Sequence, residues 1–441
     1  MKKLLSIFFS IAFLFISSCS KDKEYDKTKA ISAFAAIDPI KVDPALEKIE
    51  ITIPSQIENQ IWYGSNNDQN SRVENFAFDF LKSKKLRINR EIWSSYNYRL
   101  PDRFVFSPVI KDNKVFLLDS SGNLSARDLS SKKKIWKKRI FPKMFLKNYQ
   151  TPKIGYFDGK IFAIAGINKI STVSDVDGKI LWSKDIASIP ISTPISDGNL
   201  VYVSTNDNKL YAFNITDGEL QWVHSGILRT TAIFGVGNPV IYKNNIIVSY
   251  SSGEIYALNK KTGEPIWYED LNVNRAVNSD FYLNDVDATP LVKNDIVYAI
   301  GNGGFMMAID VQKGGYLWKK EIAGVTDFWL AGDFLFVINN DNKLLAIDKK
   351  SGGIKWISQL ANFKKETKPE TKIIYDGVVM AGDKLLISST RGEILIVSPL
   401  DGKIEQTFKT GEEIYHSPVI VNGKIYLHTM GRYLIDLIEI E

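Results

Sequence analysis

Few side chains in this sequence could carry out catalysis or bind a metal. Its 441 residues include three histidines, His224, His416 and His428, and a single cysteine, Cys19. Zinc sites and nucleophilic catalysis need such side chains in close groups, and the spacing of these four predicts no group. The sequence also contains no Gly-x-Ser-x-Gly or phosphate-loop motif. We therefore assign no catalytic, cofactor-binding or metal-binding residue.

The N-terminus has the pattern of a secretory signal. Met1-Lys2-Lys3 gives a positive start, and residues 4–16 form an apolar run broken only by two serines. That run is too short to span a bilayer. Ile16-Ser17-Ser18-Cys19 resembles a lipobox, which implies cleavage before Cys19, acylation of this cysteine and sorting to the outer membrane, because Ser20 and not Asp follows it. The alternative is a chance cysteine behind an ordinary signal peptide.

The composition is that of a packed globular protein. Hydrophobic residues make up 44%, aromatic residues 12% and charged residues 24%, which excludes a disordered chain, a collagen and a multi-span membrane protein. The net charge is only +6, and no basic cluster is interleaved with aromatic residues. We therefore expect no nucleic-acid partner.

Tryptophans recur at a period of about 44 residues. Seven of the nine follow one another at intervals of 38 to 51 residues, and Gln406 holds the next position in register. A glycine stands four residues before most of them, and a small residue usually stands six residues before that glycine. The tryptophans are Trp93, Trp136, Trp182, Trp222, Trp267, Trp318 and Trp356. Repeats of this length indicate a propeller or solenoid, and we interpret the tryptophans as packing residues between repeats.

Each repeat predicts four short strands. Between Thr193 and Trp222, β-branched and aromatic runs alternate with turns at Asp197-Gly198, Asn206-Asp207-Asn208 and Asp217-Gly218. Gly and Asn accept the positive φ angles that tight hairpins require. A Ser, Thr or Asn followed by Pro opens six repeats, and the gap from Pro290 to Pro418 leaves room for two openings without proline. The sequence thus predicts an all-β, eight-bladed β-propeller with four-stranded antiparallel blades.

The two ends of the chain predict how the ring closes. The last repeat, from Ser417 to Glu441, supplies only three strands. The missing outer strand matches Ile88 to Ser94, so we expect this N-terminal strand to complete the eighth blade and remove an open edge. The expected domains are a signal peptide at 1–18, a lipidated N-terminus and flexible tether at 19–60, and the propeller at 61–441. Such a tether reaches roughly 35 Å.

A lipoprotein signal joined to an eightfold propeller resembles the BamB family, accessory lipoproteins of the outer-membrane β-barrel assembly machinery. The resemblance runs from Trp62 to the C-terminus, and its most specific part is Asn284-Asp285-Val286-Asp287-Ala288-Thr289-Pro290. It implies a non-catalytic scaffold without a cofactor, held by lipid at the periplasmic face of the outer membrane. It also implies binding to the periplasmic domains of BamA and help in inserting outer-membrane proteins.

The resemblance also implies particular contact residues. Members of the family bind BamA through a Leu-Arg pair in one loop and an Asp-x-Asp motif in the next. The matching residues here are Leu228 and Arg229 in the first loop and Asp285 and Asp287 in the second. A further family leucine, two residues before Leu228, is Gly226 in this chain. Both segments link an outer strand to the next inner strand, so we expect them on one face of the ring.

Two other interpretations remain open. The tryptophan repeat is similar to that of pyrroloquinoline-quinone (PQQ) dehydrogenases, which are also eight-bladed, so a periplasmic quinone-dependent dehydrogenase is the alternative function. Those enzymes typically carry adjacent cysteines under the cofactor, and this chain has none. Exposed outer strands could also receive segments of unfolded outer-membrane proteins by strand addition.

Overall fold

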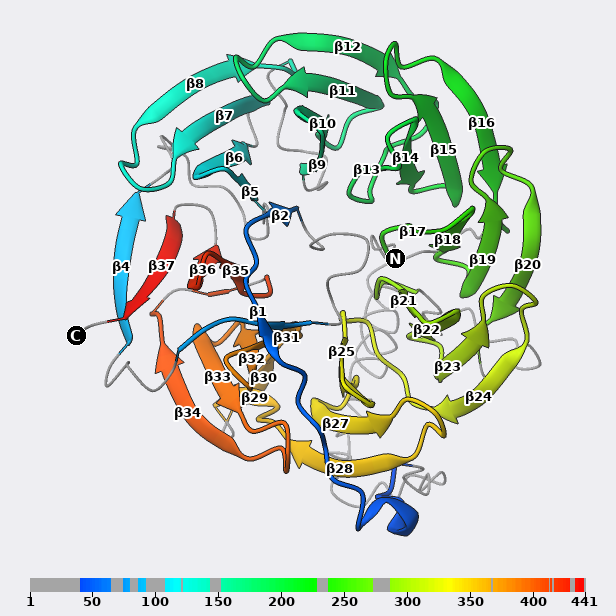
Figure 1. Cartoon of the computed structure of the whole chain (residues 1–441), viewed down its shortest axis with the longest axis vertical. Coiled ribbons are helices and arrows are strands. Elements are labelled where there is room, and N and C mark those ends of the chain that lie inside the picture. The colour runs from blue at the N-terminus through cyan, green and yellow to red at the C-terminus, as the bar shows by residue number, and fades with distance from the viewer. Residues whose placement is uncertain are drawn as a thin grey trace, which may run out of the picture. The chain divides into compact units, whose positions relative to one another are not determined.

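The computed structural model describes most of the chain as a ring of β-sheets (Figure 1). Described residues are 40–64, 74–79, 86–92, 108–119, 122–142, 152–227, 237–272, 286–365, 368–411, 413–414, 416–428 and 433–439. The expected signal peptide and Cys19 therefore lie outside the described residues. Residues 40–441 form one compact unit. In the described part, no helix is long and apolar enough to cross a membrane.

The first four blades follow chain order from the inner to the outer strand. Blade 1 contains β5 (Val109–Lys111), β6 (Lys114–Leu118), β7 (Asn123–Asp128) and β8 (Lys134–Arg139). Blade 2 contains β9 (Lys153–Phe157), β10 (Lys160–Ile164), β11 (Lys169–Ser174) and β12 (Ile180–Asp185). Blade 3 contains β13 (Ile195–Ser196), β14 (Leu200–Thr205), β15 (Lys209–Asn214) and β16 (Leu220–Ser225). Blade 4 contains β17 (Val240–Tyr242), β18 (Asn245–Ser249), β19 (Glu254–Asn259) and β20 (Pro265–Asp270).

The next three blades repeat this order. Blade 5 contains β21 (Leu291–Lys293), β22 (Ile296–Ile300), β23 (Phe305–Asp310) and β24 (Tyr316–Glu321). Blade 6 contains β25 (Trp329–Ala331), β26 (Phe334–Ile338), β27 (Lys343–Asp348) and β28 (Ile354–Gln359). Blade 7 contains β31 (Tyr375–Ala381), β32 (Lys384–Ser389), β33 (Glu393–Val397) and β34 (Ile404–Lys409). A separate hairpin of β29 (Phe363–Lys365) and β30 (Lys368–Lys372) stands between blades 6 and 7.

The eighth blade joins the two ends of the described chain. Strands β35 (Val419–Val421), β36 (Lys424–His428) and β37 (Tyr433–Glu439) are completed by β4 (Leu86–Ile92), which pairs antiparallel with β37 from Tyr433↔Ile92 to Glu439↔Leu86. The predicted closure by an N-terminal strand is confirmed. Each of the eight blades contains four antiparallel strands, as the repeat predicts, and strands from residues 56–76 extend the sheets of blades 1 and 7.

The repeated tryptophans pack between blades. Trp93 lies outside the described residues. Each of the other six indoles lies against the glycine of the following blade: a Cβ on Gly178 would stand 2.7 Å from Trp136, and one on Gly402 would stand 2.6 Å from Trp356. These two glycines have φ of 73°, so only glycine fits both the space and the backbone. The small residue of each repeat pairs directly with the tryptophan, as in Ala212↔Trp222. The periodic Gly, Ala and Trp are therefore one packing device.

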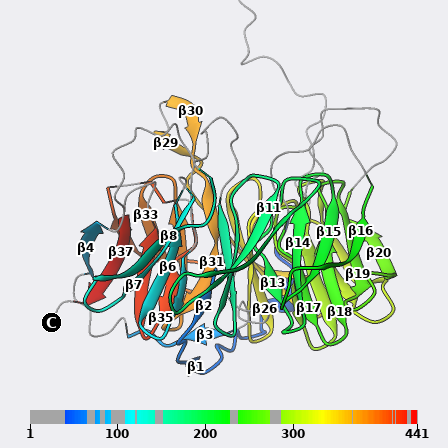
Figure 2. The same ribbon diagram turned by 90° about the horizontal axis from the view of Figure 1, so that it is seen from above.

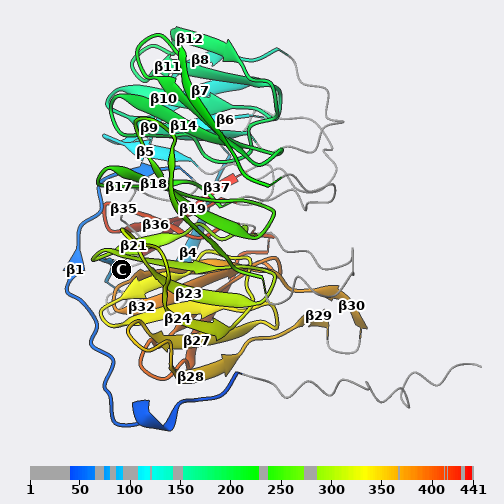
Figure 3. The ribbon, with the colours of Figure 1, turned by 90° about the vertical axis from the view of Figure 1, so that its right-hand side faces the viewer.

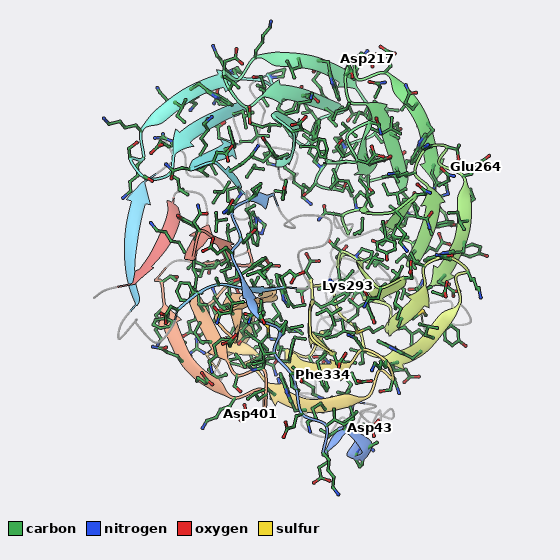
Figure 4. The ribbon with its side chains drawn as sticks, viewed as in Figure 1. Asp43, Asp217, Glu264, Lys293, Phe334 and Asp401 are labelled. Carbon is green, nitrogen blue, oxygen red and sulfur yellow. The ribbon has the colours of Figure 1, made fainter. Side chains whose placement is uncertain are left out.

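Residues 40–63, the strap, cross one face of the ring. The strap contains the 3-10 helix η3 (Pro44–Leu46) and strands β1 (Gln56–Ile57) and β2 (Trp62–Tyr63); β1 pairs with β3 (Asn75–Phe76), β3 with β31, and β2 with β5. The strap begins at the rim, where Asp43 lies beside β28 and donates its backbone N–H to Ile354 (Figure 4). Leu46 and Glu47 accept hydrogen bonds from Lys355 through their carbonyl oxygens.

The strap covers the turns between first and second strands. Asn59 donates to the carbonyl of Ile420 and accepts from the N–H of Asn422, and the N–H of Gly382 binds the carbonyl of Phe76. The sequence predicts a flexible tether through residue 60, yet residues 40–60 pack on the propeller. The propeller partners of Asp43, Leu46 and Asn59 lie about 300 or more residues away in the chain, so local sequence periodicity carries no sign of these contacts.

Candidate interaction face

The face opposite the strap carries the links between blades. We call it the link face; it bears the turns between second and third strands and the segments that run from each outer strand to the next inner strand. Figures 2 and 3 show β1 on one side of the ring and the β29–β30 hairpin on the other. The N–H of Gly226, at the start of a link, binds the carbonyl of Asn208 in a second-to-third-strand turn. This bond puts both kinds of segment on one face.

Three of the four predicted contact residues lie outside the described residues: Leu228, Arg229 and Asp285. Asp287 is described, between the buried side chains of Val286 and Ala288. The ends of the two predicted links meet, because the N–H of Gly237 donates to the carbonyl of Val286 over 3.0 Å. The described ends of the two links therefore lie side by side.

The residues that open neighbouring blades are joined by a chain of hydrogen bonds. The N–H of Thr193 donates to Oδ1 of Asn238 over 2.6 Å, and the N–H of Asn238 donates to Oγ1 of Thr289 over 3.1 Å. The N–H of Thr289 in turn donates to Oδ1 of Asp327 over 2.7 Å. Asn238 and Thr289, which stand before two of the prolines, thus cap the opening of the preceding blade, which explains why the sequence marks these two positions. Asp327 does the same at one of the openings without proline.

Lys153, from blade 2, lies near the carboxylates of Asp287 and Asp327. Burial lowers the pKa of Lys153 to about 8, while the negative charges of Asp327 and Asp287 act in the opposite direction. Lys153 is the first residue of β9, and both aspartates belong to links of blades farther along the ring. The sequence analysis singled out Asp287 as a contact residue but did not identify Lys153 or Asp327. No local motif marks them, because their proximity depends on ring closure.

An aromatic cluster supports the start of the link between blades 3 and 4. His224 Nδ1 lies 2.8 Å from the hydroxyl of Tyr250, and the two rings stack at 5.8 Å between centroids. Burial lowers the pKa of His224 and raises that of Tyr250 well above its usual value. A Cβ on Gly226 would stand 2.5 Å from the Tyr250 ring. Gly226 therefore leaves room for Tyr250, and a leucine at this position would collide with that ring.

The described residues contain no group of three or more His, Cys, Asp or Glu side chains that could hold a metal ion. His416 lies 3.8 Å from Asp376 through its Nδ1 atom, and His224 belongs to the aromatic cluster. The side chain of His428 lies outside the described residues.

Comparison with known proteins agrees with the fold and the repeat. Residues 143–358, about half of the chain, match the sequence family described as "Outer membrane protein assembly factor BamB". The protein of that name from Yersinia pestis is 25% identical over 226 residues, which cover 50% of this chain and 58% of the relative. Its Escherichia coli counterpart is 23% identical over 230 residues, with 51% and 59% covered. The matches thus span less than two thirds of these curated relatives.

Solved structures show the same architecture. The crystal structure of BamB from Moraxella catarrhalis superimposes with a TM-score of 0.66 at 17% identity, covering 80% of this chain and all of that chain. A europium-containing methanol dehydrogenase gives a TM-score of 0.64 at 13% identity, covering 83% and 89%. Since both identities are low, these likenesses concern the fold. Together with the matched sequence family, the eight closed blades identify the chain as a BamB-type protein built from PQQ-like repeats.

Proposed function

We propose that this protein is a non-catalytic scaffold of the outer-membrane β-barrel assembly complex. In this role it binds the periplasmic domains of BamA through its link face and aids the insertion of outer-membrane proteins. The observation that supports the proposal most directly is the asymmetry of the ring. The protein's own strap occupies one face, and the opposite face carries the links that resemble the family's partner-binding loops. The names of the relatives, assembly factors of the outer membrane, agree with this role.

The proposed contact combines charge and apolar surface. Arg229 offers a forked donor to a carboxylate or a backbone carbonyl, and Asp285 and Asp287 accept hydrogen bonds from lysine or backbone N–H groups. Leu228 supplies apolar contact, and Arg229 is of a residue type that is enriched among the residues that dominate binding energy at protein interfaces. Tryptophans that pack each of blades 1 to 6 against the next blade make the ring a rigid support for these loops. The scaffold then orients its partner and takes no catalytic part in the folding of the client protein.

The proposed location follows from the N-terminus. Acylation of Cys19 would hold the protein at the periplasmic face of the outer membrane, since several acyl chains together anchor firmly, each buried CH₂ contributing about 0.8 kcal/mol. The ring itself remains in the aqueous periplasm.

A second, smaller proposal concerns client proteins. The outer strands of blades 3, 4 and 5 expose large apolar side chains: Leu220 is 51% exposed, Tyr268 59% and Leu317 58%. Outer strands have one unpaired backbone edge, which can accept an extended segment as an added strand. We propose that unfolded outer-membrane proteins bind there transiently.

Co-purification tests the main proposal. Wild-type protein and the variant Leu228→Glu with Arg229→Glu are recovered from detergent-solubilised membranes, and the BamA that accompanies each is measured. We expect the variant to lose most of it. Leu400→Glu with Lys403→Glu is the matched control, because it makes the same change in charge at an exposed turn on the rim. Undiminished recovery by the link-face variant would remove the site assignment. Quinone- and calcium-dependent dye reduction by the purified protein would instead support the dehydrogenase alternative.

A further inference from the structure

Ile227 is held by both of its backbone polar groups at the start of the link between blades 3 and 4. Its carbonyl accepts a hydrogen bond from Nδ2 of Asn208 over 2.9 Å, and its N–H donates to Oε2 of Glu254 over 3.4 Å. Asn208 belongs to blade 3 and Glu254 to blade 4. The side chain of Ile227 is nevertheless 50% exposed. A large apolar side chain is thus displayed to solvent from a fixed backbone.

Asn208 is itself rigidly placed. It lies in the turn between β14 and β15 with φ of 57° and is buried, a conformation that asparagine tolerates better than most residues. Its Oδ1 accepts from both the N–H and the hydroxyl of Ser251, over 3.1 and 2.7 Å. Its carbonyl accepts from the N–H of Gly226 over 2.8 Å. Asn208 therefore ties the second-to-third-strand turns of blades 3 and 4 to the beginning of the link.

Glu254 holds the other side of Ile227. Its side chain is only 2% exposed, and its Oε2 atom accepts from the hydroxyls of Ser252 and Tyr256 over 3.3 and 3.4 Å. A buried carboxylate is costly unless hydrogen bonds satisfy it. The N–H of Ile227 donates to this carboxylate together with the hydroxyls of Ser252 and Tyr256. The position of Ile227 therefore contributes to the stabilisation of the buried Glu254 carboxylate.

The same position in other blades does not display a large apolar side chain. Five residues after the tryptophan, the chain has Phe141, Ala187, Ile227, Asn272, Ala323 and Ala361 in the six blades from 1 to 6. Phe141 is 1% exposed, and the others besides Ile227 are small or polar. The packing that the repeat requires therefore does not explain why a large, exposed apolar side chain stands at position 227. The preceding position normally faces the core, as buried Leu271 and Leu360 show, and at Gly226 the ring of Tyr250 fills that space.

We propose that Ile227 is a further contact residue of the link face, and that Asn208 and Glu254 are its positioning residues. This inference rests on the proposed function. The partner surface that fits it is an apolar patch on a folded protein domain, beside groups that accept hydrogen bonds from Arg229. In this arrangement Ile227 supplies apolar contact next to Leu228 where the chain has glycine at position 226.

Binding of the BamA periplasmic domains to the full-length, detergent-solubilised protein tests the contact. Removing the apolar side chain with Ile227→Ser is expected to weaken binding about tenfold, the value for burial of roughly half an isoleucine side chain. Leu400→Ser is the matched control, because Leu400 is 54% exposed in the turn between β33 and β34, on the opposite face. This control is expected to bind as wild type does.

A second pair of variants tests the positioning role. Asn208→Asp keeps the acceptor for Ser251 and removes the donor to Ile227 and to the hydroxyl of Ser252. Because only the bond to Ile227 reaches the contact residue, the variant is expected to weaken binding about threefold, as loss of one hydrogen bond would. Asn342→Asp is the control. Asn342, in blade 6, has the same φ of 57°. Its carbonyl accepts from the N–H of Leu360, and its Nδ2 donates to the carbonyl of Ile373. Both variants should have similar unfolding midpoints, and only Asn208→Asp should affect binding.

Combining the changes separates positioning from general stability. If Asn208 acts through Ile227, the double variant Ile227→Ser with Asn208→Asp binds no more weakly than Ile227→Ser alone. Additive losses would overturn the positioning role. Wild-type affinity of Ile227→Ser, together with lost binding by Leu228→Glu with Arg229→Glu, would overturn the contact residue and leave the proposed function intact. Failure of the wild type to bind BamA would overturn both.

Discussion

The two faces of the ring differ in what the chain itself places on them. On the strap face, residues 40–63 and 74–79 bind the turns of blades 7 and 8 through Asn59 and Phe76. On the link face, described segments such as that of Ile227 hold their backbone in place and expose side chains. Backbone groups that are already paired within the molecule offer little to a partner. The difference indicates that one face stabilises the ring while the other is available for binding.

The largest expected effect concerns the strap side. Trp329 is 1% exposed, donates from Nε1 to the carbonyl of Glu74 over 2.8 Å and packs edge-on against Phe76. We expect Trp329→Ala to lower the free energy of unfolding by about 4 kcal/mol, as large-to-small core changes do. The measurement is chemical denaturation, with BamA binding measured on the protein that remains folded. Binding should be unchanged.

Trp222→Ala is the control for this variant. Trp222 is only half-buried, and its Nε1 atom has no hydrogen-bond partner, so a loss of about 2 kcal/mol is expected for its smaller buried area. A smaller cost for Trp329→Ala than for Trp222→Ala would mean that residues 74–79 contribute little to the ring.

A smaller effect is expected at Lys153, the first residue of the inner strand of blade 2. Because the pKa of Lys153 falls to about 8 in the folded protein, the unfolded chain binds more protons than the folded one between about pH 8 and the usual lysine pKa of about 10.4. Stability should therefore rise with pH across this window, by up to about 3 kcal/mol. Below pH 8 the folded state carries the full cost of the buried charge.

Unfolding of wild type and Lys153→Met across this window checks the pH effect. The variant should lack the rise. An identical slope in both proteins would assign the pH dependence to other groups.

The sequence allowed the ring to be predicted well, because its signals are local and repeated. Gly178, Ala212 and Trp356 each belong to a pattern that recurs every 38 to 51 residues, and the proline openings mark the inner strands. Closure by residues 86–92 could also be predicted, since the last repeat lacks one strand. The strap could not, because Asn59 and Lys355 bind partners about 300 or more residues away. Asp43 followed by Pro44, a common helix start, is the one local sign of η3.

The candidate site was only partly predictable. The family resemblance selected Leu228, Arg229, Asp285 and Asp287, and these assignments remain predictions. Ile227, Asn208 and Glu254 were not selected, because exposure of an isoleucine and burial of a glutamate depend on neighbouring blades. The structure explains why glycine replaces the family's leucine at position 226, because the ring of Tyr250 fills the space beside it.

Site-specific crosslinking tests most directly the claim that partners bind the link face. Asn206 and Asn199 are both exposed and both belong to blade 3, the first in a turn of the link face and the second in a turn of the opposite face. A photocrosslinking amino acid is placed at one position or the other, and membranes are irradiated. The account predicts a crosslink to BamA from position 206 and none from position 199. A crosslink from position 199 alone would contradict it.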